Sequence, residues 1–224
     1  MSKGKITPKN ILHQHKKKNN PITLDNLLEK ASSNNVADAM KNLYGKHGLI
    51  KDIKPINPSY KVVGRVRTVK TNSNDWGTGI KAIYASEPGE ILFIDCSDCE
   101  NAIWGELASQ AAKKYGISAT IINGASRDTG ETLKTGFKLF SKDTMSNAGH
   151  PLNEGTINER LVIDDNVIIN GDIVVADRDG VIIIPQENVD EVIKEVNNIK
   201  KFESDCVKQI IEQNAQLDKL VNIN

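Results

Sequence analysis

The residues most able to take part in chemistry, through a side chain or through the backbone, lie in two short segments of the chain. They are Gly105, Glu106, Leu107, Arg127, Asp128 and Glu131. Grouped carboxylates without a Cys or His cluster suit a hard, oxygen-seeking cation such as Mg²⁺. An arginine beside them can hold a carboxylate through two hydrogen bonds. These residue types therefore predict a site at which a small organic acid is held against a divalent metal.

The elements around these segments should bring them together. Residues 91–95 and 119–122 are apolar runs of the kind that form buried strands, and residues 105–115 form an Ala-rich helical segment between them. Strand, helix and strand in this order predict a βαβ unit with parallel strands. Ligand sites of such sheets lie beyond the carboxyl ends of the strands. Glu106 and Asp128 are therefore expected at one rim, where free amides at the helix start suit an anion.

Each feature also has an ordinary structural explanation. Acidic residues at the start of a helix commonly complement the helix dipole. An Arg-Asp pair in a loop is commonly a surface ion pair. Residue spacing by itself therefore leaves open whether the rim holds a metal and a substrate or neither.

The same segments resemble the signature of the RraA-like family, which includes the 4-hydroxy-4-methyl-2-oxoglutarate aldolases. The resemblance covers about residues 30–200 and implies an α/β fold with a swivelling-domain-like β/β/α sandwich. It also implies trimers or hexamers with active sites at subunit interfaces. The matching segments are Gly105-Glu106-Leu107-Ala108, Ala111-Ala112, Gly116 and Asn123-Gly124-Ala125-Ser126-Arg127-Asp128, supported by Val36-Ala37-Asp38-Ala39, Pro88-Gly89, Gly136-Phe137 and Asp177-Arg178-Asp179-Gly180.

The resemblance to the aldolase branch implies a role for each polar residue. Asp128 would ligate Mg²⁺ or Mn²⁺, Glu106 would hold a metal-bound water, and Arg127 would bind the pyruvate-like group. The backbone around Leu107, with Gly105 before it, would contact the substrate. These roles imply a metal-dependent lyase that releases pyruvate from a 2-oxo acid, by retro-aldol cleavage or by decarboxylation of oxaloacetate.

Two positions qualify this assignment. Glu131 falls where the aldolase branch carries an acid three residues after its Arg-Asp pair, so it is a further candidate metal ligand. Asn123 stands where family members often have Asp, which puts catalytic efficiency in question.

Aldolases of this family also take an acidic residue from the C-terminal region of a neighbouring subunit. Neither Glu203 nor Glu212 of this chain aligns clearly with that residue.

A non-enzymatic function is the alternative. Some RraA proteins bind a ribonuclease or a helicase and inhibit RNA turnover, and such regulators tend to lack the full acidic set. This chain keeps Glu106, Asp128 and Glu131. The sequence therefore favours an enzyme over a regulator.

Composition excludes several other classes of protein. The 224 residues include 29 basic and 29 acidic side chains, and 38% are hydrophobic. A neutral chain of this kind is neither disordered nor a strongly basic nucleic-acid binder. No apolar run approaches the roughly 18 residues of a membrane span, and three Cys are too few for a disulfide scaffold. We therefore expect a cytoplasmic protein with no membrane partner.

The chain divides into three predicted parts. Residues 1–20 contain six Lys and no acid, which predicts a flexible basic tail. Residues 21–186 form the α/β domain, in which Asp-Gly at 179–180 predicts a hairpin between two apolar runs. Residues 187–224 form a C-terminal helical extension, with a long helical pattern from Asn188 to Leu220. Its heptad spacing suits packing on its own domain or on a partner.

Two further features have mainly structural interpretations. Cys96 and Cys99 form a Cys-x2-Cys that lacks the second pair of a zinc site, so an ordinary loop is expected. Trp76 and Trp104 are expected to pack in the core, although Trp104 could instead form a wall of the pocket.

Overall fold

The computed structural model describes residues 31–223, so the predicted basic tail at 1–20 lies outside the described part of the chain. Ten of the described strands join in one mixed, curled sheet, and two more form a separate hairpin. The strands are β1 Leu49–Ile50, β2 Lys54–Pro55, β3 Val62–Lys70, β4 Ile91–Asp95, β5 Ala102–Trp104, β6 Ala119–Ser126, β7 Leu139–Thr144, β8 Thr156–Ile157, β9 Leu161–Ile163, β10 Asn166–Ile168, β11 Ile173–Ala176 and β12 Val181–Ile184.

Six α-helices and one short 3₁₀ helix accompany the strands in the described residues. The first of them follows the capping residue Ser32, whose hydroxyl accepts a hydrogen bond from the backbone amide of Asn35. The helices are α3 Ser33–Tyr44, α4 Gly77–Tyr84, α5 Glu106–Tyr115, α6 Thr129–Thr135, α7 Val189–Gln213 and α8 Leu217–Leu220, with the 3₁₀ helix η1 Gln186–Asn188.

The predicted βαβ unit is present. Strands β4 and β6 pair in parallel from Ile91 with Ala119 to Asp95 with Asn123, and α5 connects them. Two details differ from the prediction. The short strand β5 precedes α5 and pairs in parallel with β6. Strand β6 also continues through residues 123–126, beyond the end of the predicted strand at residue 122, because β7 and β5 supply hydrogen-bonding partners on both sides.

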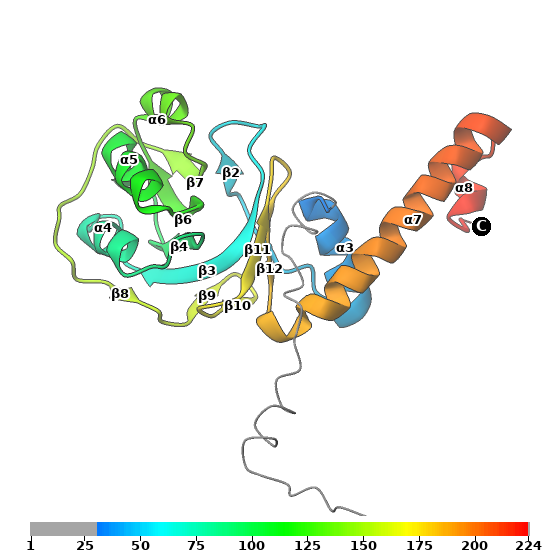
Figure 1. Cartoon of the computed structure of the whole chain (residues 1–224), viewed down its shortest axis with the longest axis horizontal. Coiled ribbons are helices and arrows are strands. Elements are labelled where there is room, and N and C mark those ends of the chain that lie inside the picture. The colour runs from blue at the N-terminus through cyan, green and yellow to red at the C-terminus, as the bar shows by residue number, and fades with distance from the viewer. Residues whose placement is uncertain (1–30, 224) are drawn as a thin grey trace, which may run out of the picture.

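The sheet has the order β1-β12-β11-β3-β4-β6-β7-β2. Outside this order, β5 pairs with β6 and β8 pairs with β3. Strands β11 and β12 are antiparallel, as expected for the hairpin around Gly180. Strand β3 belongs to both halves of the sheet, because it is antiparallel to β11 and parallel to β4. Figure 1 shows this long strand curving between the two halves.

Three apolar clusters hold the layers together. One lies inside the curled sheet and contains Phe93, Ile121 and Val174. A second lies beneath α4 and α5, and the third joins α3 and α7 to β11 and β12. Each fully buried aliphatic or aromatic side chain of this kind contributes about 1.5–3 kcal/mol. The arrangement of the sheet, the βαβ unit and helix α7 confirms the predicted α/β architecture, a sandwich with a βαβ core and a long C-terminal helix.

The C-terminal helix differs in length from its prediction. Helix α7 ends at Gln213 because Asn214 adopts a left-handed conformation and caps it, and α8 follows as a separate short turn. Its N-terminal half packs on the domain through Val192 and Val196. Figure 1 shows the remainder of α7 projecting beyond the sheet. None of the helices in residues 31–223 combines the length and apolar character needed to cross a bilayer.

Candidate active site

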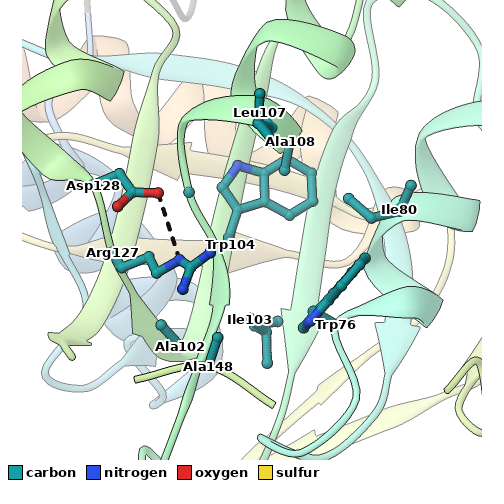
Figure 2. A pocket seen from close by; sticks show the side chains of 11 residues that line it. Trp76, Ile80, Ala102, Ile103, Trp104, Leu107, Ala108, Arg127, Asp128 and Ala148 are labelled. Atoms are coloured by element: carbon teal, nitrogen blue, oxygen red, sulfur yellow. Dashed lines mark ion pairs between the residues drawn. The ribbon is translucent and has the colours of Figure 1, made fainter. Parts of the chain in front are cut away.

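A hollow of about 150 Å³ lies between α4, α5 and the carboxyl ends of β5 and β6. Figure 2 shows Arg127 and Asp128 at one end of it, Trp76 and Ile80 at the other, and Trp104 between them. The residues that line it are Trp76, Ile80, Ala102, Ile103, Trp104, Gly105, Leu107, Ala108, Arg127, Asp128 and Ala148.

Gly105 permits a close approach between the two polar segments. An added Cβ at this position would lie 2.5 Å from Asp128 Oδ2 and 3.2 Å from Arg127 Cγ. The backbone amide of Arg127 also donates to the carbonyl of Trp104 at 2.8 Å. The glycine therefore lets the Asp128 carboxylate lie directly against the start of α5.

Arg127 and Asp128 form a loose, accessible pair. Arg127 Nε lies 3.5 Å from Asp128 Oδ2, and the two side chains are 44% and 46% exposed. Asp128 has a φ of 52°, a left-handed conformation that Asp tolerates better than most residues. Because the pair is long and half-exposed, both groups keep bonding capacity for a bound molecule.

Trp104 is held by a buried chain of hydrogen bonds. Its indole Nε1 donates to Ser109 Oγ at 3.0 Å, and this hydroxyl donates to the carbonyl of Gly105 at 2.9 Å. The chain fixes both the indole ring and the first turn of α5. Trp104 is therefore buried in the core and also lines the hollow, so both expectations for this residue are met.

Asp75 anchors the opposite wall. This fully buried carboxylate accepts hydrogen bonds from the Thr78 and Thr71 side chains and from the backbone amides of Asn153 and Glu154, among others. Burial by itself would raise the pKa of Asp75, but these hydrogen bonds outweigh it and hold the pKa well below its usual range. Asp75 thereby ties α4 to the segment after Ala148.

The predicted site residues separate into two groups. Gly105, Leu107, Arg127 and Asp128 line one hollow. Glu106 occupies the first turn of α5 beside them, half-buried, but is not a lining residue. Glu131 does not line the hollow either.

Lys134 accounts for the position of Glu131. Its ammonium group donates to both carboxylate oxygens of Glu131 at 2.7 and 2.8 Å, one helical turn along α6. This ion pair directs Glu131 along the surface of its own helix. The sequence suggested Glu131 as a further metal ligand, and this role stays a prediction; in the structure Glu131 pairs with Lys134 within α6.

The donor set fits a divalent cation that a substrate helps to hold. No group of three or more His, Cys, Asp or Glu side chains within residues 31–223 converges in the manner of a complete metal cage. Mg²⁺ commonly uses only one or two carboxylates and keeps waters or substrate oxygens as its other ligands. Asp128, half-exposed in the space that Gly105 leaves open, suits that mode.

A second polar cluster lies at the ends of β3, β4 and β6. Asp95 accepts hydrogen bonds from Lys70 Nζ at 2.7 Å and from Asn123 Nδ2 at 2.8 Å. Lys70 also contacts the Ser97 hydroxyl. Asn123, the position that departs from the family pattern, is therefore bonded to its neighbouring strand. Cys96 beside it is a buried free thiol whose pKa is raised by burial, consistent with a structural loop.

Sequence reasoning missed several contributors to the site. Ile80 and Ala148 complete its walls, Ser109 orients Trp104, and Asp75 holds the wall that carries Trp76. An Asp just before the start of a helix was an available signal, since Asp side chains commonly accept hydrogen bonds from the first amides of a helix, as Asp75 does from the Thr78 amide. The contacts of Asp75 with residues 153–155 had no local signal.

Comparison with known proteins identifies the relatives of the chain. The RraA-like family, described as aldolase/RraA, matches residues 33–183. An uncharacterised protein of Methanocaldococcus jannaschii is 37% identical over 190 residues, which cover 83% of this chain and 88% of that protein. A protein of Halalkalibacterium halodurans, provisionally named a 4-hydroxy-4-methyl-2-oxoglutarate aldolase, is 31% identical and covers 84% of this chain and 90% of its own length.

A solved structure agrees with the fold. RraAS2 of Streptomyces coelicolor, described as an unusual member of the RNase ES inhibitor RraA family, has a TM-score of 0.74 at 19% identity. The match covers 84% of this chain and 98% of that one. Family match, curated relatives and shared fold agree, and the chain belongs to the RraA-like family.

Proposed function

We propose that the protein is a divalent-metal-dependent lyase that cleaves a 2-oxo acid and releases pyruvate. The observation that carries the proposal is the pairing of Asp128 with Arg127 across the space left by Gly105. A carboxylate for a cation and a guanidinium for an anion meet in one small hollow. The substrates are of the 4-hydroxy-4-methyl-2-oxoglutarate type, with oxaloacetate as a substrate for decarboxylation.

Binding of the substrate follows from the charges at the polar end of the hollow. Arg127 holds the substrate carboxylate through charge-assisted hydrogen bonds. The first amides of α5, which have no partners within the helix, add further donors around Leu107. Asp128 would hold Mg²⁺ or Mn²⁺, and the bound ion would supply Lewis-acid stabilisation of the charge that develops on the keto oxygen.

The remaining residues control water and protons. Cleavage leaves an electron pair on C3 of the pyruvate unit, so this carbon must receive a proton. Glu106, at the first turn of α5, orients the water that delivers it. Trp76 and Trp104 exclude bulk water from the apolar end, which strengthens the electrostatic interactions at the polar end.

A coupled assay tests the proposal. The protein is incubated with oxaloacetate and Mg²⁺, and pyruvate is followed through NADH oxidation by lactate dehydrogenase. We expect turnover above the rate of Mg²⁺ alone, abolished by EDTA and restored by added Mg²⁺. Asp128→Asn should reduce turnover at least about 100-fold, as the loss of one electrostatic stabiliser does. Asp165→Asn, an exposed carboxylate in the β9–β10 turn, is the matched control.

The same assay decides between the enzyme and the regulator. If oxaloacetate and 4-hydroxy-4-methyl-2-oxoglutarate both give no metal-dependent pyruvate, and EDTA makes no difference, the lyase assignment fails. Binding of a ribonuclease or a helicase would then be the function to test.

The proposal includes a homo-oligomer, a trimer or a hexamer. Leu107 lines the hollow and is 84% exposed, so the hollow is open to solvent at this side chain. A second copy that covers it would close the hollow. Light scattering should give a mass at least three times that of the chain, and a monomer would refute the assembly.

A further inference from the structure

The backbone of Trp104 and Gly105 is held from two sides within one chain. On one side, the backbone amide of Arg127 donates to the carbonyl of Trp104 at 2.8 Å. On the other side, the carbonyl of Gly105 accepts from the backbone amide of Ser109, in the first turn of α5, at 3.1 Å. This short segment therefore connects the end of β6, which precedes Arg127, with the start of α5.

Ser109 adds a second connection to this segment through its side chain. Its hydroxyl donates to the carbonyl of Gly105 at 2.9 Å and accepts from the indole Nε1 of Trp104 at 3.0 Å. A serine hydroxyl has one proton to donate and lone pairs with which to accept, so it makes both bonds at once. Because Ser109 is fully buried, solvent does not compete for either bond.

The carbonyl of Gly105 sets the direction of the amide that follows it. A trans peptide is planar, so its C=O and its N–H point in opposite directions. The carbonyl of Gly105 is directed into α5 toward Ser109, and the amide of Glu106 is therefore directed out of the start of the helix. This amide is among those to which the proposed function assigns the substrate carboxylate.

The same peptide borders the carboxylate of Asp128. A Cβ at Gly105 would lie 2.5 Å from Asp128 Oδ2, so the carboxylate lies directly against this glycine. A rotation of the Gly105 peptide would change the surface on which the half-exposed Asp128 side chain rests. Misplacement of a reacting group by about 1 Å can cost about 100-fold in rate. The site therefore depends on the position of this one peptide.

We propose, building on the proposed lyase function, that Ser109 is a positioning residue for the site. Its hydroxyl holds the Gly105 peptide and the Trp104 ring in place. Asp128 and the amide of Glu106 thereby keep the positions that the metal and the substrate require. All of these groups belong to one chain, so the role does not depend on which element of a second copy closes the hollow.

Mn²⁺ binding tests the role without depending on turnover. Free Mn²⁺ gives an electron paramagnetic resonance signal that is lost on binding, so titration of the full chain with Mn²⁺ alone gives a Kd. Ser109→Thr and Ser109→Val have the same shape and share any cost of the added methyl group, but only Thr keeps a hydroxyl. Ser109→Ala removes the hydroxyl without adding volume. The kcat/KM for oxaloacetate with Mg²⁺ is measured on the same variants.

Loss of the hydroxyl should weaken the site, and its retention should preserve it. In Ser109→Ala and Ser109→Val the Kd of Mn²⁺ should rise and kcat/KM should fall, each at least about tenfold, as the removal of hydrogen bonds behind a ligand commonly does. In Ser109→Thr both values should lie close to those of the unmodified chain and at least about tenfold better than those of Ser109→Val.

Ser86→Ala is the matched control. Ser86 is also buried, and its hydroxyl donates to the carbonyl of Ala82, likewise four residues earlier, at 2.7 Å. It follows α4 and does not line the hollow. Ser86→Ala should therefore lower the Tm while it leaves both the Kd of Mn²⁺ and kcat/KM unchanged.

The outcomes separate this role from the lyase activity itself. Unchanged Mn²⁺ affinity and kcat/KM in Ser109→Ala, or an equal loss in Ser86→Ala, would overturn the role of Ser109 and leave the lyase standing. Absence of both Mn²⁺ binding and turnover in the unmodified chain would refute the lyase, and the role with it. Any variant that fails to fold, judged by near-ultraviolet circular dichroism, is replaced by Ser109→Cys, whose thiol is a much weaker hydrogen-bonding group.

Discussion

Replacing Asp75 with Asn tests whether one buried carboxylate holds the wall of the site. Asp75 is fully buried, and its two oxygens serve different donors. Oδ1 accepts from the backbone amides of Thr78 and Asn153, and Oδ2 accepts from those of Glu154 and Gly155. Asn matches Asp in shape but replaces one of these oxygens by a donor.

The cost follows from counting the amides that lose their acceptor. The Asn side chain does the least damage with its nitrogen at the Oδ2 position, where the Glu154 amide alone loses its acceptor, because the Gly155 amide also donates to Thr78 Oγ1 at 2.9 Å. Each unsatisfied buried donor costs about 1–3 kcal/mol. The Thr hydroxyls can rotate to accept from the new amide and limit the damage. Asp75→Asn should therefore lower the free energy of unfolding by about 2 kcal/mol, a substantial part of the 5–15 kcal/mol typical of a domain.

Urea unfolding monitored by tryptophan fluorescence measures this loss at one protein concentration. Asp165→Asn, which changes an exposed carboxylate, should unfold like the unmodified chain. If Asp75→Asn destabilises by less than about 1 kcal/mol, or no more than the control, the assigned role of the buried hydrogen bonds is wrong.

The pH dependence gives an independent check. Because the folded-state pKa of Asp75 is depressed, its charged form contributes stability that is fully present above the unfolded pKa of about 4. That contribution is lost as the pH falls from there through the lower folded pKa. The stability difference between the unmodified chain and Asp75→Asn should thus be constant from pH 5 to 8 and shrink below pH 4. A difference that changes across the neutral range would contradict this assignment.

The remaining predictions concern the polar end of the hollow. Gly105→Ala should reduce kcat/KM at least about tenfold with little change in Tm, because the new Cβ would displace Asp128 while the extended backbone accepts alanine. Arg127→Lys should raise KM at least about tenfold and change kcat less, since a single ammonium replaces a bidentate contact. Glu131→Gln should keep at least half of the activity, because Lys134 already holds that carboxylate; a loss as large as that of Asp128→Asn would return Glu131 to the metal site.

Local patterns in the sequence predicted the central unit of the fold. The apolar runs at 91–95 and 119–122 and the Ala-rich segment between them are strands and a helix because burial and helix propensity act over a few residues. The parallel pairing then follows from the crossover, which places residues 105 and 128 at one rim. Even so, β6 was longer than predicted, since strand length depends on neighbours that the segment itself does not reveal.

Helix-spacing patterns were less reliable at the ends of elements. The heptad pattern from Asn188 to Leu220 suggested one helix, but the left-handed Asn214 divides it into α7 and α8. Similarly, Glu131 has the charge expected of a metal ligand, and the sequence did not indicate that it pairs with Lys134 one turn later. A side chain can take part in a local ion pair or helix cap instead of a contact with a distant residue or a ligand. Residue types alone do not show which of these contacts it makes.

The sequence by itself determined the βαβ unit, the polar residues at its rim and the family resemblance that names their roles. Tertiary structure decided what surrounds them. Asp75 accepts hydrogen bonds from donors 78 to 80 residues away, and Trp76 and Trp104 line the same hollow. Which side chains share a cavity depends on how the whole sheet curls and on which loops close over its edge. Those contacts are between residues distant in the chain, so no pattern within a short segment encodes them.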